Sequence, residues 1–546
     1  MNKKTDHRAH VTRRNVLKTG AAGLAAATMP AGVSFAQAPK RGGTLRVSNG
    51  GDPPDLDMHQ SLTYLTEMLG APCYSTLHKV DPNDYNRLIP DLADKYEVAA
   101  DGKAVTFHLN KKAVFHNGAP LTADDVIFTL DRIRNPPPGV VSPRKGLLSN
   151  IESLSAPDTH SVLIKLKEPQ PDFPFLVSNP YNSIYSRAVT EPLDKQGQGM
   201  KRQIVGTGPF QLTRAIDGQI YEFARFDKYF GKPANLDKIQ NFPIKGEVER
   251  SVALQGNRID ACFFFSNDAV LQTLRKTKDM VVVQRPSPTF INLIPNVTVK
   301  PFDDIRVRQA LSLAIDRDAF IKTVGPLAGS NFHSLGLMLP GSPYSLGAEE
   351  VKQFAGCDTL PGLGGDINAN RKRAMELLEQ AGVAKGHKVT LIARADLSAF
   401  RDASINVAAQ LKTIGLDAAV DVRDAAAFYE LENAKKFDIV VHSVGLTGAL
   451  PDQILGEGYT SYGGRNYGGW KNEEIDTLFR QQSRESDPEK RKELIRQFQL
   501  TFMKTYFQVN LAWVGYGGAH SAAMKGWNAL PDIYANMQLD NVWLES

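Results

Sequence analysis

The sequence predicts an α/β protein built as two lobes that are joined by a hinge. Strand-like and helix-like segments alternate between residues 374 and 442, which is typical of helices packed against a sheet. An earlier region of strands and helices ends near residue 288, and the tail after residue 510 is too short to form a domain of its own. We therefore expect the tail to return to the first lobe, so that the chain crosses between the lobes near 285–290 and again near 508–514.

The earlier region contains short runs of alternating apolar residues that end at turn residues, which is the pattern of strands. Thr122 followed by Asp125 resembles a capping box and predicts a helix start there. Residues 301–317 predict one capped helix. The expected strands of this region are 44–48, 104–109, 161–166 and 221–226.

The alternating region predicts its elements one by one from apolar spacing and from glycines at helix ends. Two further helices follow it and precede the tail. The expected helices are 374–381, 398–414, 425–434, 472–483 and 488–506, and the expected strands are 389–393, 416–422 and 437–442.

The first 36 residues form an export signal. A basic head is followed by a mildly apolar stretch, 19–35, and by Ser34-Phe35-Ala36, which is a small-x-small cleavage pattern. The stretch is too short and too weakly apolar to span a membrane. Residues 12–18, with Arg13 and Arg14, resemble a twin-arginine signal. An ordinary basic head is the alternative to twin-arginine export.

The compartment and the charge follow from this signal. No Cys precedes Cys73, so we expect no lipid anchor at the cleavage point and a soluble periplasmic product. The chain has a formal net charge of +5, and six Lys and Arg against Asp6 in the signal account for all of it. The rest of the chain is neutral and lacks the clustered basic residues on which nucleic-acid binding relies.

Motifs for catalysis and metal binding are not evident. The sequence has no Gly-x-Ser-x-Gly elbow, Walker loop or His-Glu-x-x-His. Cys73, Cys262 and Cys357 are scattered and fit no metal pattern, so we expect mostly buried, unpaired cysteines. We predict no catalytic residue, no metal and no cofactor.

Several motifs stand in the order found in a large bacterial family. They include Arg41-Gly-Gly-Thr-Leu-Arg-Val, Val114-Phe-His-Asn-Gly-Ala-Pro-Leu-Thr-Ala-Asp-Asp-Val-Ile-Phe, Gly206-Thr-Gly-Pro-Phe and Phe302-Asp-Asp-Ile-Arg-Val-Arg-Gln-Ala-Leu. Together they make residues 41–546 resemble extracellular solute-binding proteins of family 5, the dipeptide-, oligopeptide- and nickel-binding components of ABC transporters.

The resemblance implies a bilobal periplasmic-binding-protein fold with a hinge and an extra N-terminal subdomain. It implies capture of a small solute, peptide or other polar metabolite, and its delivery to the membrane permease subunits of an ABC importer, by a chain that acts as a monomer and binds no nucleic acid. A periplasmic hydrolase and a chaperone or signalling receptor on the same fold are the alternatives. The expected parts are a signal peptide at 1–36, lobe 1 at 37–287 with the subdomain at about 61–205, lobe 2 at 288–510 and the return to lobe 1 at 511–546.

Ligand contacts in the family come from the turn after the first strand, from the hinge strand and from loops of the second lobe. Carried over, these segments are 52–60, 289–292, 442–452 and 461–470. The last of them carries aromatic, amide and guanidinium groups among glycines, which suits polar ligand capture, although a flexible surface loop has the same composition. The candidate ligand-binding residues are Asp55, His59, Phe290, Asn292, His442, Thr447, Asp452, Ser461, Asn466, Tyr467 and Trp470.

One departure from the family pattern concerns the solute. Peptide-binding members carry a Trp and, three residues later, an Asp that holds the amino terminus, but Val444 and Thr447 stand at these positions here. An ammonium group buried without a carboxylate is costly. A neutral or anionic solute is therefore an alternative to a peptide, unless Asp452 takes the role of the missing acid.

Overall fold

The computed structural model describes residues 38–324, 332–333, 336–339, 341–360, 362–445, 450–529 and 534–545. From Lys40 onward these residues form a single unit. Below, lobe 1 means residues 40–279 and 522–545, and lobe 2 means residues 296–508.

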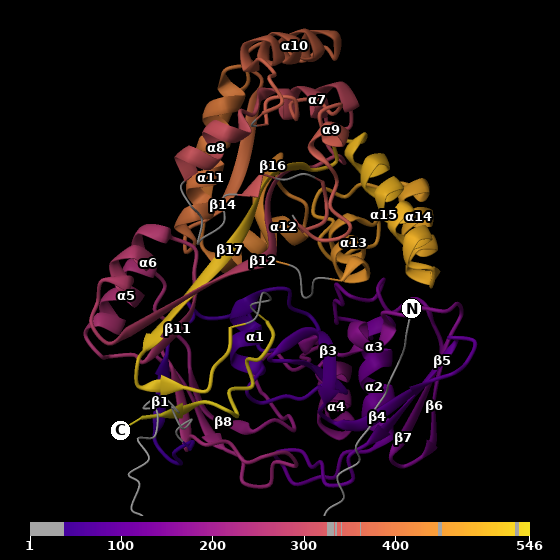
Figure 1. Cartoon of the computed structure of the whole chain (residues 1–546), viewed down its shortest axis with the longest axis vertical. Coiled ribbons are helices and arrows are strands. Elements are labelled where there is room, and N and C mark those ends of the chain that lie inside the picture. Colours follow the sequence, from indigo (N-terminus) through magenta and orange to yellow (C-terminus); the bar gives the residue numbers. More distant parts are fainter. Residues whose placement is uncertain are drawn as a thin grey trace, which may run out of the picture. The chain divides into compact units, whose positions relative to one another are not determined.

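Two long strands connect the lobes. β12 (Met280–Pro295) and β17 (Val509–Ser521) pair antiparallel over almost their whole length, and Figure 1 shows them running from the elements of lobe 1 into those of lobe 2. Their register shifts between Pro286 and Thr289. On one side of this shift β17 pairs with β11 (Ala261–Phe265) of lobe 1, and on the other β12 pairs with β16 (Ile439–Gly445) of lobe 2. A change of the angle between the lobes therefore has to bend only these two strands.

Lobe 1 contains the strands of this sheet that continue from β17 through β11. β1 (Thr44–Val47) lies parallel to β10 (Lys238–Asn241) and to β11, and β9 (Ile220–Arg225) and β8 (Phe210–Ile216) continue the sheet. The helices α5 (Glu247–Gln255) and α6 (Asp268–Arg275) follow β10 and β11. At the C-terminal end, β18 (Met524–Lys525) pairs with β19 (Trp543–Leu544).

An extra subdomain is inserted in lobe 1 between β1 and β8, and it has its own apolar cluster. Its four-stranded sheet has the order β4-β5-β7-β6, and β2 and β3 form a separate hairpin. Its strands are β2 (His78–Asp81), β3 (Asp84–Pro90), β4 (Ala93–Val98), β5 (Ala104–Leu109), β6 (Ile151–Asp158) and β7 (Ser161–Leu166), and its helices are α1 (Tyr64–Gly70), α2 (Ala123–Arg134), α3 (Phe173–Val177), α4 (Arg187–Lys195) and the 3-10 turn Pro180–Asn182.

Lobe 2 is the alternating α/β region that the sequence predicts. β15 (Asp417–Arg423), β14 (Lys388–Arg394) and β16 lie parallel, with the connections α11 (Ser398–Lys412) and α12 (Ala425–Asn433). The short strand β13 (Phe332–His333) pairs with β17. The other helices are α7 (Ile305–Ala314), α8 (Arg317–Val324), α9 (Ala348–Val351), α10 (Ile367–Gln380), α13 (Pro451–Tyr459), α14 (Glu473–Arg484) and α15 (Pro488–Met503).

The fold class is confirmed, and one element differs from the prediction. The helix expected over 301–317 is shorter: α7 spans Ile305–Ala314, and a separate helix, α8, begins at Arg317. Asp304 caps α7 by accepting the Arg306 N–H at 2.8 Å, and the helix stops at Ile315, whose backbone is extended. The three cysteines are buried and unpaired, as expected.

Candidate functional site

A small cavity is enclosed between the lobes. It measures about 50 Å³, enough for a few water molecules, and we call it the inner cavity. Residues of the turn before α1, of β11 and of the C-terminal return line it from lobe 1, and the ends of β14 and β16 and helix α12 line it from lobe 2. Its lining residues are Leu62, Thr63, Tyr64, Phe264, Thr289, Arg394, Leu397, Phe400, Phe428, Tyr429, Val441, His442, Arg465 and Tyr534.

A larger cavity of about 880 Å³ adjoins the inner one along the chain, and we call it the outer cavity. Tyr64 and Arg394 line the inner cavity, and the residues that directly follow them, Leu65 and Ala395, line the outer one. The outer cavity is also lined by residues 51–54 and 245–249 of lobe 1 and by residues 424–426 of lobe 2. Its volume lies in the range of small-molecule sites.

The inner cavity combines aromatic walls with buried positive charge. Arg394 forms a bidentate ion pair with Asp396, with Nε–Oδ1 at 3.0 Å and Nη2–Oδ2 at 2.5 Å, and its Nη1 donates to the Tyr429 hydroxyl at 2.7 Å. Arg465 donates from Nη1 to the Tyr467 hydroxyl at 2.9 Å and from Nη2 to the Leu62 carbonyl at 3.3 Å. Among the described residues that line this cavity, none is acidic.

Of the residues predicted from the sequence, His442 reaches the inner cavity directly. Phe290 and Asn292 lie on β12 near the lining residue Thr289, but both side chains are fully buried. Phe290 packs against Tyr459 and Trp513, and Asn292 donates to the Gln508 side chain. Thr447 lies outside the described residues.

The loop 461–470 is held mainly by its own polar groups. Asn466 Oδ1 accepts the N–H groups of Gly469 and Trp470 at 2.9 and 3.1 Å, and its Nδ2 donates to the carbonyls of Ser461 and Trp470 at 3.0 and 2.8 Å. Ser461 Oγ accepts the Asn472 N–H at 2.9 Å. The Asn466 side chain thus fixes the loop that brings Arg465 to the cavity.

Tyr467 and Trp470 lie behind the cavity wall. Trp470 is 1% exposed and stacks on Phe507 with ring centroids 5.8 Å apart. Tyr467 is 4% exposed, and its ring centroid lies 5.1 Å from that of His442. The Tyr467 ring supports His442, which lines the cavity, whereas the Trp470 ring packs among buried apolar residues.

Asp452 lies at the start of α13, away from the inner cavity. It accepts hydrogen bonds from Gln170 of lobe 1 and from Gln482, Ser483 and Arg491 of lobe 2, at 2.7 to 3.2 Å. Burial raises the pKa of Asp452, as does the neighbouring Asp172. This carboxylate joins the two lobes.

Asp55 and His59 lie on the turn of lobe 1 that leads to the inner cavity. Asp55 Oδ1 accepts the Asp57 N–H at 2.9 Å, and burial raises the pKa of Asp55 to about 6. His59 Nε2 lies 2.8 Å from the Ser183 carbonyl, and its ring stacks on Tyr185 with centroids 3.8 Å apart. Burial lowers the pKa of His59 to about 3, so this ring is neutral.

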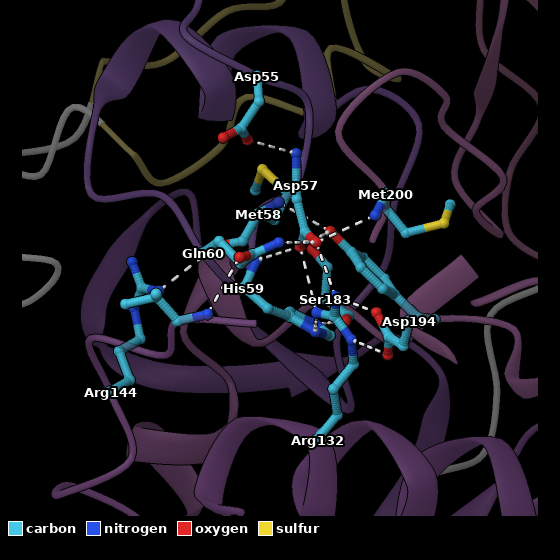
Figure 2. A network of polar contacts seen from close by, with 12 residues as sticks. Asp55, Asp57, Met58, His59, Gln60, Arg132, Arg144, Ser183, Asp194 and Met200 are labelled. Atoms are coloured by element: carbon cyan, nitrogen blue, oxygen red, sulfur yellow. Dashed lines mark hydrogen bonds and ion pairs between the residues drawn. The ribbon is translucent and has the colours of Figure 1, made fainter. Parts of the chain in front are cut away.

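A buried ion network holds this turn in place (Figure 2). The Arg132 guanidinium of α2 lies between Asp57 and Asp194, with Nη2–Oδ2 of Asp57 at 2.7 Å and Nε–Oδ2 of Asp194 at 2.7 Å. Its Nη1 also lies 2.9 Å from His59 Nδ1. Burial alone would raise the pKa of Asp57, but the charge of Arg132 and the hydrogen bonds from Arg132 and Gln60, together with His59, outweigh burial, and the pKa is lowered to about 2.

A second arginine completes the support of the turn. Arg144 donates to the carbonyls of Met58 and Ser61 at 3.4 and 2.7 Å, and its guanidinium lies over the Tyr181 ring. Thr63, which lines the inner cavity, caps α1 by accepting the Leu65 N–H at 3.3 Å. The buried network therefore fixes the backbone immediately before the residues that face the solute cavity.

A buried carboxyl group lies beside His442. Glu432 of α12 is 1% exposed, and its Oε1 lies 3.3 Å from His442 Nε2. Burial raises the pKa of Glu432 to about 8, against the opposing charges of Arg465 and Arg394. The pair has the distance of an ion pair, but we assign a protonated Glu432 at neutral pH, because burial outweighs the nearby positive charge.

Sequence reasoning missed Arg394, Tyr429, Arg465 and the Arg132 network. Arg465 lies within the predicted segment 461–470, whereas Arg394 directly follows the predicted strand 389–393. Within the described ranges, no group of three or more His, Cys, Asp or Glu side chains is arranged to hold a metal ion. No helix in that same part of the chain has the length and apolarity needed to cross a membrane.

Two α/β lobes that are crossed by two strands and enclose a cavity define the class of two-lobed binding proteins. The family model described as bacterial extracellular solute-binding proteins, family 5, middle part, matches residues 87–466. This match covers more than half of the chain, so the chain belongs to this solute-binding family.

Known proteins resemble the chain over most of its length. The dipeptide-binding protein of Escherichia coli K12 is 29% identical over 454 residues, which cover 76% of this chain and 81% of the relative. The glutathione-binding protein GsiB of Salmonella typhimurium is 26% identical over 497 residues, which cover 89% and 92%. These relatives are binding proteins.

Solved structures share the fold. The periplasmic binding protein DppA of Helicobacter pylori, in complex with the peptide STSA, superposes with a TM-score of 0.81 at 22% identity and covers 93% of this chain and 99% of its own. AgaA of A. tumefaciens R10, in complex with agropinic acid, has a TM-score of 0.81 at 23% identity, with coverage of 92% and 99%. The two-lobed fold is thus confirmed.

Proposed function

We propose that this chain captures a small solute in the inner and outer cavities and delivers it to the membrane permease of an ABC importer. The enclosed cavity between two lobes carries this proposal, because a ligand that touches both lobes binds the closed form better and shifts the equilibrium toward it. Family membership and the dipeptide- and glutathione-binding relatives support it.

The solute class is either a small peptide or another polar metabolite with a carboxylate. Arg394, Arg465 and His442 at the inner cavity suit an acceptor group of the solute. The charge of Arg394 is already matched by Asp396, so a solute carboxylate at this position would share or displace that partner. We place the solute against His442 and Arg465, with Tyr467 as the residue that supports both.

Binding without chemistry is part of the proposal. The hydrolase alternative would need an activated nucleophile beside a base, and the buried His59 and His442 lie against a carbonyl and a buried carboxyl group. We further propose export by the twin-arginine-type signal, cleavage near Ala36, a periplasmic location without a lipid anchor and a monomeric state. Residues 1–36 lie outside the described part of the chain.

Solute-dependent thermal stabilisation tests the proposal. A panel of Met-Leu, glutathione and agropinic acid should contain a compound that stabilises the protein by about 2.7 kcal/mol at a hundredfold excess over its dissociation constant. His442→Asn should weaken that compound's binding at least about tenfold, which is 1.4 kcal/mol, because it removes a group from the cavity wall. His160→Asn, in a turn of lobe 1 distant in sequence from every lining residue, is the matched control.

If wild type and His442→Asn bound the stabilising compound with equal affinity, the inner cavity would not be its binding site. Stabilisation by agropinic acid alone would favour the non-peptide class, and stabilisation by Met-Leu or glutathione would favour peptides.

A further inference from the structure

The lobes touch along a seam that is separate from the solute cavities. The seam consists of residues 143–147 and 170–172 of lobe 1 and of residues 452–464, 482–483 and 491 of lobe 2. None of them lines the inner or the outer cavity. In Figure 1, α13, α14 and α15 of lobe 2 lie opposite α3 of the subdomain on this side of the molecule.

The polar part of the seam is a partly buried network that spans both lobes. Arg491 of α15 donates from Nη1 and Nη2 to Asp172 of lobe 1 at 3.3 and 2.6 Å. Gln170 of lobe 1 donates from Nε2 to Asp452 Oδ2 at 2.8 Å. Asp452 also accepts Arg491 Nη2 at 3.2 Å, so one arginine lies between two carboxylates from different lobes.

The half of this network in lobe 2 is preorganised. Gln482 and Ser483 donate to Asp452 Oδ1 at 2.7 and 2.8 Å, and Arg491 Nε donates to Gln482 Oε1 at 3.3 Å. These contacts persist when the lobes separate, because all their members belong to lobe 2. Separation breaks the contacts of Gln170 and Asp172 but leaves Arg491 paired with Asp452, so the arginine keeps a carboxylate partner in the open form.

The apolar part of the seam depends on glycines. A Cβ atom at Gly146 of lobe 1 would lie 2.5 Å from Cδ2 and 2.9 Å from the backbone oxygen of Tyr462 in lobe 2. A Cβ atom at Gly464 of lobe 2 would lie 2.6 Å from the Pro143 oxygen of lobe 1. The two lobes therefore approach at the level of their backbones, and only glycine leaves the space.

We propose that this seam is a closure latch, in which Asp172, Arg491 and Asp452 and the glycine contacts stabilise the closed form of the ligand-free protein without touching the solute. Asp452, which sequence reasoning assigned to the solute, is a positioning residue in this arrangement. The proposal does not depend on the identity of the solute.

Distances between the lobes in the ligand-free protein test the latch. Nitroxide labels on cysteines introduced at Lys165 of lobe 1 and Gln497 of lobe 2, both exposed, report the separation by double electron–electron resonance. The three native thiols are buried, and burial raises the pKa of each, so they react poorly with the label. The wild type should show a short distance, from the closed form, beside a longer distance from the open form.

Two variants should open the protein. Gly146→Ala adds a methyl group whose three nearest atoms all belong to Tyr462 of the other lobe, and Asp172→Asn removes the charge that pairs with Arg491. Each should lower the ratio of the short-distance to the long-distance population at least about threefold, because a population shift follows the free energy removed from one state. Melting temperature should change little in Gly146→Ala, since its nearest contacts lie in lobe 2 alone.

Matched controls remain within lobe 2. Gly347→Ala places a Cβ atom at an ordinary 3.5 Å from Glu350 Oε2, and Glu350→Gln removes the partner of Arg496 on the same helix α15. Both should keep the wild-type distance distribution. The absence of a short-distance population in the ligand-free wild type, an unchanged distribution in both Gly146→Ala and Asp172→Asn, or equal opening in the controls would overturn the latch.

Discussion

Arg132→Met should lower the free energy of unfolding by about 3–5 kcal/mol, because it leaves two buried carboxylates without their shared cation. The Asp57 side chain is fully buried, Asp194 is 5% exposed as a residue, and Arg132 lies within 2.7 Å of both. The methionine fills the space of the arginine stem, so the loss reports charge rather than volume. Urea unfolding followed by circular dichroism measures it.

Arg134→Met is the control for this prediction. Arg134 lies two residues further along α2 and pairs with Asp131, whose side chain is 50% exposed, so the variant should lose less than about 1 kcal/mol. A loss below about 1 kcal/mol for Arg132→Met as well would show that the network in Figure 2 does not hold the turn that leads to the cavity.

Glu432→Gln should remove a contribution to stability that falls with pH between about pH 5 and 8. The folded protein holds the Glu432 proton up to a pKa of about 8, whereas the unfolded chain releases it near 4.3. Unfolding in this window therefore releases the proton of Glu432, and the contribution of this group to the free energy of unfolding falls by about 1.4 kcal/mol per pH unit as the pH rises. The uncharged amide of the variant has no such slope.

The difference between wild type and variant isolates this group from the other titrating residues. Glu430→Gln, on the same helix and exposed, should keep the wild-type slope. If Glu432 were instead ionised in the folded protein throughout this window, wild type and Glu432→Gln would show the same pH slope, and the assignment of a neutral carboxyl group beside the cavity would be wrong.

The fold was largely predictable because its strongest signals are local. The segment from β14 to β16 shows clear apolar spacing, and glycines mark the ends of its helices. The stop between α7 and α8 was missed, because no glycine or proline marks Ile315, and an extended backbone there follows from tertiary packing rather than from local sequence.

The segments that reach the cavity were predictable from the sequence, but the contacts of their individual side chains were not. The expected segments do bring Thr289, His442 and Arg465 to one cavity. Asn466 and Trp470 lie in the same loop, yet a composition of amides and aromatics does not reveal that Asn466 bonds to its own backbone. Arg132 and Asp57 meet across 75 residues of sequence, and no spacing rule predicts such a pair.

Native mass spectrometry of the purified protein tests solute binding most directly. We expect one small molecule bound per chain. Its mass should be the same in the complex, after release by denaturation and after prolonged incubation with fresh protein. His442→Asn should carry less of it. Recovery of a chemically altered molecule, or equal loading of wild type and variant, would contradict a receptor that binds its solute at the cavity between the lobes.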